Sequence, residues 1–476
     1  MRFFFGKGIH SFNKWYIRQN ILMNWINLLG AYRFGDQLPR VMDEAQNRSI
    51  FEQDYDRIIF STPFRRLQDK TQVIPLPEYD FVHNRLTHSI EVSSVGRTLG
   101  KMVGTALIEK YPELKQLSLS HHDFGAIVAA ASLAHDIGNP PFGHSGESAI
   151  SEYFLNGEGA KYQAQLSESE WNDIIRFEGN ANGFRILTHA GNGSLGGLRL
   201  SYPTLAAFTK YPKQSLPVLP KGRASEKKFG FFQSEKDLFD ELALKLDLLQ
   251  VNHSIGKYYR RHPLAFLVEA ADDICYHIID FEDGLRMQWI DFEWAEKLLL
   301  PIAGKAFYRA SYDALSLVEE KASYLRAVAI NSLIKEMSDI FLQNEEAILA
   351  GTFDTSLINL SVHKNEIDQI KAISLQKVYK AKQVLEIEAA GFEVIGGLLN
   401  MFLQALQHVC NPNLAKMQYK QAKMAELLPA HLKAPKNAIK ESTYLQIISV
   451  CEFVAGLTDR HAISLFRKLK GIEMPH

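Results

Sequence analysis

Apolar residues spaced three and four positions apart are the feature that most restricts the fold of this chain. The spacing recurs in FEQDYDRIIF, HSIEVSSVGRTLGKMVGTALIEKY, FGAIVAAASLAHD and HPLAFLVEAADDICYHIIDFED, and it continues after Ala303. Such spacing puts the apolar side chains on one face of an α-helix, whereas a half-buried strand alternates with a period of two. Few segments alternate in that way, so the sequence predicts an all-α protein.

The length of the chain allows a large core. Its 476 residues, 46% of them hydrophobic, fit one large domain or two to three ordinary ones. Gly, Pro and Lys gather over residues 191–234, which predicts one long irregular loop. We expect an N-terminal tail or extension over 1–34, a catalytic core over 35–300 that includes this loop, and a C-terminal helical region over 301–476.

Charge and cysteine content exclude several classes of protein. The formal net charge is −1, so no global field attracts nucleic acid or an anionic membrane, and a polyanion would need a local cluster of cations. Cys275, Cys410 and Cys451 form neither a Cys-x-x-Cys zinc pair nor an even set for disulfides, which fits a reducing, cytoplasmic location. The N-terminal stretch lacks the apolar core of a signal peptide, and translation starts at Met1 and at Met23 both remain open. No later segment is expected to span a membrane.

The stretch AHDIGNPPFGHSGE, residues 134–147, places an imidazole and a carboxylate where a buried helix ends. Asp123 is a good N-cap, so His135 and Asp136 fall on the last helical turn before Gly-Asn-Pro-Pro stops the helix. Because the chain turns away there, both side chains can converge on one ion. Taken alone, a His-Asp pair is common and is weak evidence for a metal.

Two other predicted helices supply further donors. His88 lies near the start of one helix, and Pro263 opens another that buries Asp272 among Ala, Val and Ile. Two imidazoles and two carboxylates form a mixed nitrogen and oxygen set that suits Mn²⁺, Fe²⁺, Mg²⁺ or Zn²⁺ with positions open for water or phosphate.

The identity of the fourth ligand has alternatives. Asp273 is the rival donor, and a structural ion pair with Arg260 or Arg261 is the other interpretation of Asp272. We favour Asp272 as the ligand because Tyr276 and Asp280 follow it at four-residue steps. The three side chains therefore line one helical stripe that can face a single cavity.

The order His, His-Asp, Asp resembles the HD-domain phosphohydrolases, and six blocks between residues 35 and 470 resemble the deoxyguanosine triphosphate triphosphohydrolase family more narrowly. They are FRRLQDKTQV, NRLTHSIEV, AHDIGNPPFGHSGE, FEGNANGFRIL, EAADDICY and FVAGLTDRHA. The chain departs from the family's FEGNAQ at Asn182. The resemblance implies one-step cleavage of a deoxynucleoside triphosphate, dGTP first, to deoxynucleoside and inorganic tripolyphosphate. It also implies a divalent ion, Mn²⁺ or Mg²⁺ before Fe²⁺, Co²⁺, Ni²⁺ or Zn²⁺, held by His88, His135, Asp136 and Asp272.

The resemblance further implies that His144 and Glu147 form the catalytic pair. A glutamate three residues after a histidine can accept its second ring N–H and raise the basicity of the imidazole. The alternative is a histidine at a helix start followed by an ordinary first-turn acid. Whether His144 activates water, protonates the leaving oxygen or attacks phosphorus stays open.

A triphosphate carries about four negative charges, which this nearly neutral chain must meet with local cations. Gln72, which the resemblance places near the sugar, can bind the 3′-hydroxyl beside a tyrosine and leave no room for a 2′-hydroxyl. For each cation the alternative is a solvated surface charge. The predicted substrate-binding residues are Gln72, Arg65, Arg85, Lys210, Tyr211, Tyr276, Asp280 and Arg460. Candidates for recognition of the base are Glu386, Glu388 and Glu393.

Partners follow from the resemblance alone. Relatives form hexamers, so we expect a homo-oligomer, and some bind single-stranded DNA or are activated by nucleotides. EKKFGFF, residues 226–232, has the basic and aromatic character of a nucleic-acid contact, although a loop with its Phe side chains buried fits equally well. We interpret His121-His122-Asp123 as a helix start with exposed imidazoles.

Overall fold

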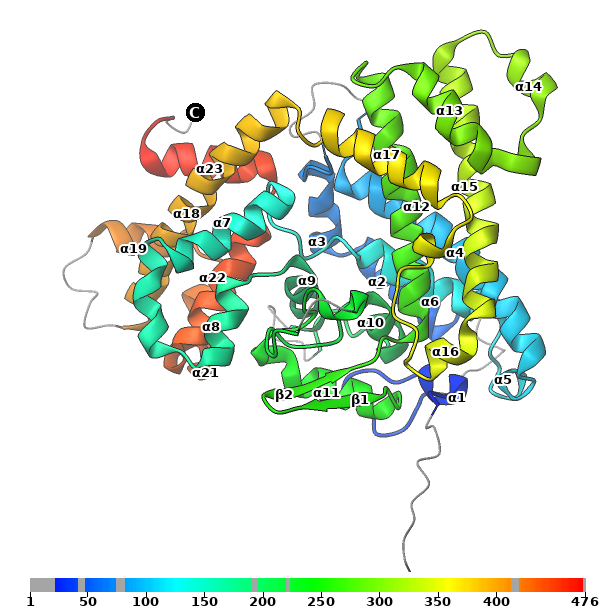
Figure 1. Ribbon diagram of the computed structural model, residues 1–476. Helices are drawn as coiled ribbons and strands as arrows, with labels where there is room; N and C mark the ends of the chain where they lie inside the picture. The colour runs from blue at the N-terminus through cyan, green and yellow to red at the C-terminus, as the bar shows by residue number, and fades with distance from the viewer. Residues whose placement is uncertain are drawn as a thin grey trace, which may run out of the picture.

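The computed structural model describes residues 22–41, 48–73, 82–189, 196–219, 223–411 and 419–473. Within these residues the regular structure is helical except for one antiparallel hairpin of β1 (Gln250–His253) and β2 (Gly256–Tyr259). The prediction of an all-α fold is confirmed (Figure 1).

Four long helices build the first of two hydrophobic cores. They are α4 (Arg85–Lys110), α6 (His121–Ala134), α12 (Pro263–Arg286) and α15 (Val318–Gln343). Helix α6 is buried on all sides from Phe124 onward, and glycines on α4 allow it to approach closely: a Cβ on Gly100 would lie 2.6 Å from the Phe124 carbonyl oxygen. Shorter elements complete this core: α1 (Trp25–Leu28), α2 (Ile50–Ile59), α3 (Thr62–Arg65), η1 (Arg66–Asp69), α5 (Glu113–Gln116), α10 (Tyr202–Phe208), α11 (Lys236–Lys245), α13 (Phe292–Ala303), η5 (Gly304–Ala306), α14 (Arg309–Asp313), α16 (Glu345–Leu349), η6 (Leu357–Leu360) and α17 (Lys364–Lys377).

The second core joins segments that are far apart in the chain. Helix α18 (Lys382–Cys410) packs against α7 (Gly143–Leu155) and α22 (Thr443–Ala455), so a segment that follows α6 directly is completed by the C-terminal region. Figure 1 shows these helices together in its left half, opposite α4, α6 and α12. The other elements on this side are η2 (Glu158–Gln165), α8 (Glu168–Ile175), η4 (Gln233–Glu235), α19 (Tyr419–Ala425), α20 (Ala430–Lys433), α21 (Asn437–Glu441) and α23 (Asp459–Lys470). Helix α9 (Gly179–Thr188) contributes to both cores, and η3 (Ala224–Glu226) contacts Asp354 near η6.

Two local expectations need correction, and one alternative at the N-terminus can be chosen. The stretch 191–234 is not one irregular loop, because its described part contains α10, which is only seven residues long and too short to show a periodicity. Helix α6 begins at His121 with Ser120 as N-cap, while Asp123 is the third residue of the helix and closes the capping box. At the N-terminus, residues 22–34 pack on the core as an extension, with Trp25 only 3% exposed.

Helix α18 also differs from the expectation that no segment could span a membrane. By length and hydropathy it could do so, and it is the one described helix of which this is true. Half of its apolar window is buried inside the protein, against α7, α22 and α23. The apolar face of α18 therefore belongs to the second core.

Candidate functional site

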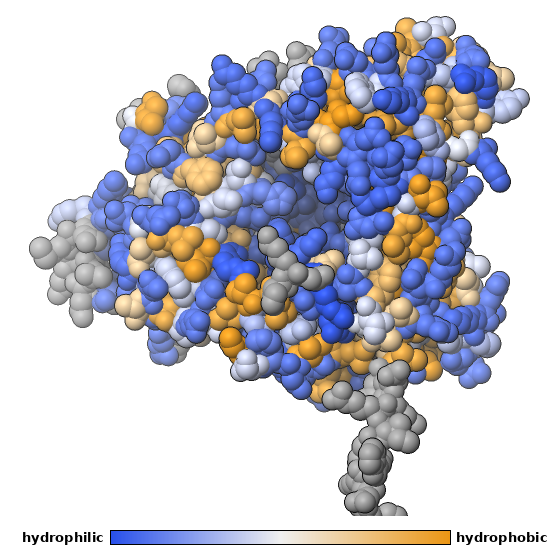
Figure 2. All heavy atoms as spheres, in the orientation of Figure 1, coloured by the Kyte–Doolittle hydropathy of each residue, from blue (hydrophilic) through white to orange (hydrophobic). Residues whose placement is uncertain are grey.

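A cavity of about 370 Å³ lies between the two cores. Helices α4, α10 and α12 and the end of α6 line one side, and the starts of α7 and α18 line the other. Figure 2 shows a hollow near the centre of this face, with hydrophilic residues in its depth. The size and position are typical of a small-molecule site between two structural units.

Four donor side chains from three helical segments converge in this cavity. His88 lies at the start of α4, His135 and Asp136 directly follow α6, and Asp272 is in α12. The Nε2 atoms of His88 and His135 lie 3.3 and 3.6 Å from Asp272 Oδ1, and His135 Nε2 lies 3.7 Å from Asp136 Oδ1. Ligands bound at about 2.1 Å to one ion lie roughly 3 to 3.5 Å apart. The donor set therefore fits a single divalent ion.

Neighbouring groups fix the tautomer and orientation of these donors. His135 Nδ1 lies 2.7 Å from the Ser132 carbonyl oxygen, so the ring donates its Nδ1–H there and presents a bare Nε2 to the cavity. Asp136 Oδ1 accepts hydrogen bonds from Arg85 at 2.7 Å and from Asn139 at 2.5 Å. Its buried Oδ2 has no protein partner among the described residues, which is costly unless a cation occupies that position.

Asp272, rather than Asp273, faces the other donors. Asp273 accepts a hydrogen bond from Ser356 at 2.8 Å, and burial raises the pKa of its carboxyl to about 7. Burial acts on Asp272 as well, but the neighbouring His135 and His88 lower its pKa on balance. Asp272 is therefore ionised at neutral pH and is the better placed ligand.

The alternative of a structural ion pair for Asp272 is wrong. Arg261 pairs with Glu269 at 2.7 Å, and Arg260 lies 3.5 Å from Glu226. Glu269 lies one turn before Asp272 on α12, and it is Glu269 that pairs with Arg261. The sequence alone could not decide between the two carboxylates.

His144 lies at the start of the helix on the opposite wall. Phe142 adopts a left-handed backbone conformation with φ of 63°, so the chain turns sharply into α7 and His144 lines the cavity. The imidazole is exposed and accessible from the cavity. Burial, together with the positive charges of Lys228 and Arg85, lowers its pKa. The neutral ring can accept a proton at pH 7.

The expected hydrogen bond between His144 and Glu147 is not formed. Glu147 is 8% exposed, accepts the backbone N–H of Gly179 at 2.7 Å and lies 3.7 Å from Lys228 Nζ. Glu147 does not line the cavity, and these partners rather than His144 hold its carboxylate, so the expectation that Glu147 raises the basicity of His144 is not met. Gly179 starts α9, a contact that three-residue spacing could not foretell.

Two of the predicted cations face the metal donors. Arg85 donates to Asp136, and Lys210 Nζ lies 3.3 Å from Glu269. Burial would lower the pKa of Lys210, but Glu269 and Tyr211 raise it on balance, so the ammonium stays charged. Both cations line the cavity that holds the donor set.

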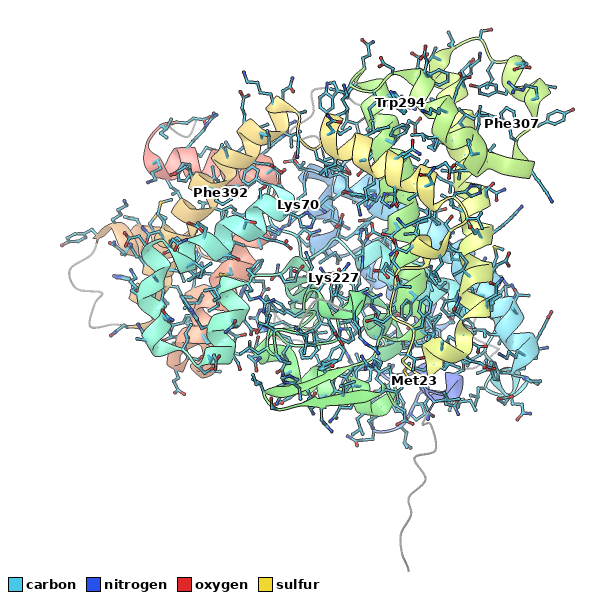
Figure 3. The ribbon with its side chains drawn as sticks, viewed as in Figure 1. Met23, Lys70, Lys227, Trp294, Phe307 and Phe392 are labelled. Atoms are coloured by element: carbon cyan, nitrogen blue, oxygen red, sulfur yellow. The ribbon has the colours of Figure 1, made fainter. Side chains whose placement is uncertain are left out.

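Lys228 is a third cation in the cavity, and the sequence analysis missed it. Its Nζ lies 2.9 Å from Glu178, and burial is outweighed by Glu147 and Glu178, which raise its pKa. The stretch EKKFGFF offered two adjacent lysines, and the acidic partner Glu178 holds Lys228 in the cavity, whereas Lys227, labelled in Figure 3, is exposed. The interpretation of this stretch as a buried-Phe loop holds for the structure.

Gln72, Tyr211 and Tyr276 line the cavity as predicted. The ring of Tyr276 stacks on Tyr379, with centroids 5.7 Å apart and planes 11° apart. Next to this pair the wall is mostly apolar and contains one carboxylate; its residues are Val384, Ile387 and Glu388.

Three predicted substrate-binding residues do not line the cavity. Asp280 is 1% exposed and accepts a hydrogen bond from the Tyr379 hydroxyl at 2.5 Å, and burial raises the pKa of Asp280 to about 7. Arg460 pairs with Asp69 at 3.1 Å on the surface, and Arg65 is exposed on α3. The geometry does not support these three predictions: tertiary contacts hold Asp280 and Arg460 elsewhere, and Arg65 is exposed.

The structure places Asn182 and two of the glutamates predicted to recognise the base. Asn182, where the chain departs from the family's glutamine, is fully buried, donates to the Gly138 carbonyl oxygen at 2.8 Å and does not line the cavity. Of the candidates for base recognition, Glu388 lines the cavity, whereas Glu386 lies near Lys382 on the surface.

Comparison with known proteins agrees with this geometry. The HD-domain family model matches residues 85–176, and the phosphohydrolase-associated domain model matches 361–468. A deoxyguanosinetriphosphate triphosphohydrolase-like protein of Synechocystis sp. is 42% identical over 95% of this chain and all of its own length. One of Pseudomonas aeruginosa is 38% identical with the same coverage. The deoxyguanosinetriphosphate triphosphohydrolase of Salmonella typhimurium is 30% identical over 91% of this chain and 96% of its own.

A helical fold with two histidines and two carboxylates converging between α4, α6 and α12 defines an HD-domain phosphohydrolase, a class of hydrolases that bind divalent metal ions. More narrowly, the chain belongs to the deoxyguanosine triphosphate triphosphohydrolase family, because its relatives match it over nearly the whole length of both chains.

Proposed function

We propose that the protein hydrolyses a deoxynucleoside triphosphate, dGTP in the first place, to the deoxynucleoside and inorganic tripolyphosphate. The observation that carries this proposal is the content of one cavity: four metal donors, an accessible imidazole and three cationic side chains. The family name of the relatives supports the choice of substrate.

The ligands we propose for the ion are His88, His135, Asp136 and Asp272. A divalent ion held there would polarise the phosphate oxygens as a Lewis acid. Around it, the protein's own cations neutralise a triphosphate that carries about four negative charges. Those cations are Arg85, Lys210 and Lys228.

Proton transfer falls to His144. In the overall reaction the oxygen of one water bonds to the α-phosphorus, the bond from phosphorus to the 5′-oxygen breaks, and the 5′-oxygen gains a proton. The neutral imidazole of His144 can take the proton of the attacking water and return it to the leaving oxygen. Glu147 takes no direct part in proton transfer; its carboxylate fixes the start of α9 by accepting the Gly179 N–H.

Substrate selection is proposed for two other parts of the cavity. Gln72 and Tyr211 would bind the sugar and exclude a 2′-hydroxyl. The apolar wall beside Tyr276 would hold the base, with Glu388 accepting hydrogen bonds from the N–H groups of a guanine edge.

We also propose the identity of the metal ion, the cellular location and the oligomeric state. The mixed nitrogen and oxygen set supports Mn²⁺ or Mg²⁺, with Fe²⁺, Co²⁺, Ni²⁺ or Zn²⁺ as alternatives. The cysteines Cys275, Cys410 and Cys451 are free thiols, which fits the cytoplasm. A homo-oligomer is proposed from the family resemblance, and light scattering on the purified protein measures its mass.

The test is ³¹P NMR of the purified protein with Mn²⁺ and dGTP, followed by the other deoxynucleoside triphosphates and GTP. Tripolyphosphate as the first phosphorus product is expected, with dGTP turned over fastest and GTP slowest. Orthophosphate or a nucleoside monophosphate would indicate a different HD-type phosphohydrolase. Nucleotide binding without turnover under every divalent metal would indicate a nucleotide-binding protein instead.

A further inference from the structure

A buried carboxylate of the second core contacts two separate walls of the cavity. Asp459 is the first residue of α23 and is 1% exposed. Its Oδ2 accepts both the backbone N–H of Thr71, at 2.9 Å, and the Thr71 hydroxyl, while Oδ1 accepts the backbone N–H of Phe142 at 3.2 Å. Thr71 and Phe142 both line the cavity. One side chain therefore joins two segments that the chain itself keeps far apart.

Each of these segments carries a residue of the proposed site. Thr71 directly precedes Gln72, so its backbone fixes where the Gln72 amide enters the cavity. Phe142 stands two residues before His144 and is held in a left-handed conformation that costs a non-glycine residue free energy. The hydrogen bond from its N–H to Asp459 helps to stabilise that turn, and the turn sets the direction of α7.

A lysine next to Asp459 makes a parallel connection. Lys70 is 3% exposed, and its Nζ donates to the carbonyl oxygens of Asn139 at 2.5 Å and Ala455 at 2.7 Å. Arg66 reaches the Gly456 carbonyl oxygen at 3.2 Å in the same junction. Figure 3 shows Lys70 between the two halves of the molecule. Hydrogen bonds thus join the end of α22 to the η1 segment, and Lys70 extends this network to the turn after the metal donors.

We propose that Asp459 is a positioning residue that sets Gln72 and His144 relative to each other across the cavity. The inference rests on the proposed function for the roles of those two residues. It goes beyond that function by assigning the relative placement of the sugar-selecting and proton-transferring groups to the C-terminal region. Asp459 itself does not line the cavity and touches no reacting group.

The substitution Asp459→Asn tests this proposal with little change of shape. An amide has only one accepting oxygen, so its NH₂ group must face either the Thr71 donors or the Phe142 N–H. At least one of the two segments then loses its acceptor and shifts. Displacements of about 1 Å at a catalytic group cost on the order of 100-fold in rate.

Asp123→Asn is the matched control. Asp123 is 5% exposed and accepts the backbone N–H and the hydroxyl of one residue, Ser120, both at 2.9 Å. Asp123 therefore accepts the same two kinds of hydrogen bond that Asp459 accepts from Thr71. It lies at the N-terminal end of α6, far from the proposed metal donors. The substitution Asp123→Asn should lower the melting temperature but leave kcat and the preference for dGTP over GTP unchanged.

Steady-state kinetics with dGTP and GTP, and the rise in melting temperature that each nucleotide causes, are measured for both variants and for Thr71→Val. In Asp459→Asn we expect kcat for dGTP to fall at least about tenfold and both measures of the dGTP-to-GTP preference to fall severalfold. Thr71→Val removes only the hydroxyl that Asp459 accepts and should lower the preference by a smaller factor. Asp123→Asn should change neither quantity.

Wild-type kcat and preference in a folded Asp459→Asn protein would overturn the inference. If that variant does not fold, an unchanged preference in Thr71→Val overturns it. If the wild-type protein hydrolyses no deoxynucleoside triphosphate, the proposed function fails, while the preference in nucleotide-induced stabilisation still decides the role of Asp459.

Discussion

The two sides of the cavity differ in how their functional side chains are held in place. On the metal side, α4, α6 and α12 bury apolar faces against one another, and the donors lie on these helices or at their ends. On the other side, α7, α18 and α22 are held in place partly by long-range polar contacts. Arg185, for example, joins Glu235 at 2.6 Å and Glu452 at 2.7 Å, both in distant segments.

This difference separates what local sequence determines from what only the folded chain determines. A donor on a buried helix has its direction set by the helix and its period. A side chain on the opposite wall has its direction set by a partner from elsewhere, as Gly179 sets that of Glu147. Substitutions on the metal side should therefore remove chemistry and leave the fold intact, whereas many on the other side should affect fold, placement or selectivity.

The largest expected effect is the loss of a metal donor. His135→Ala should reduce hydrolysis of dGTP by roughly 10³-fold or more and lower the bound metal, because the ion loses one of its two imidazoles. Metal content by mass spectrometry and release of tripolyphosphate measure the two effects. His122→Ala, which alters an exposed histidine at the start of the helix that His135 follows, should change neither. Full activity in His135→Ala would remove the donor set from the mechanism.

The next effect is on stability. Arg185 is 2% exposed, so Arg185→Met leaves two acidic partners without their cation and should lower the free energy of unfolding by about 3 kcal/mol. Urea denaturation measures it. Arg309→Met removes an exposed pair with Asp313 and should change stability by less than about 0.5 kcal/mol. Equal effects would mean that buried ion pairs do not hold the second side.

Adjacent lysines give a sharper comparison within one loop. Lys228→Met should lower kcat/KM for dGTP by about 10- to 100-fold, because a cation facing the proposed triphosphate is lost. Lys227→Met, one residue away and exposed, should leave kcat/KM unchanged. The same loss in both variants would point to the loop as a whole, and no loss in either would place the triphosphate elsewhere.

The smallest expected effect is a pH-dependent stabilisation by the ion pairs of one histidine on the metal side. His83 lies 2.8 Å from Asp283 and 3.3 Å from Glu91; burial would lower its pKa, but these carboxylates raise it to about 10. The stabilisation is complete below the unfolded pKa of about 6.5 and is lost as pH rises towards 10.

The variant His83→Gln tests this dependence. It should melt at a lower temperature than the wild-type protein at pH 6, by an amount equivalent to about 1 kcal/mol, and the gap should close by pH 10. His253→Gln, which alters an exposed hairpin residue, should show no gap at either pH. A gap for His83→Gln that is constant over this range would rule out the ion pairs as its cause.

The sequence could predict the fold class, and that the four proposed metal donors lie close together, because both depend on helical periodicity and helix ends. His88, His135 and Asp272 lie where their helices were expected to place them. The walls of the cavity were harder, for a physical reason. Lys228 faces the cavity because its ammonium pairs with Glu178, 50 residues earlier in the chain. Asp280 is separated from the cavity because the Tyr379 hydroxyl donates to its carboxylate. Tyr379 is 99 residues from Asp280 and shares no periodic pattern with it, so the sequence could not indicate this contact.

The most direct test of the central claim is the position of the oxygen that water contributes. Hydrolysis of dGTP in ¹⁸O-enriched water, followed by mass spectrometry of the products, reports which bond is broken. Attack at the α-phosphorus predicts one ¹⁸O atom in tripolyphosphate and none in deoxyguanosine. Label in deoxyguanosine, or in orthophosphate or pyrophosphate formed as the first product, would contradict the account.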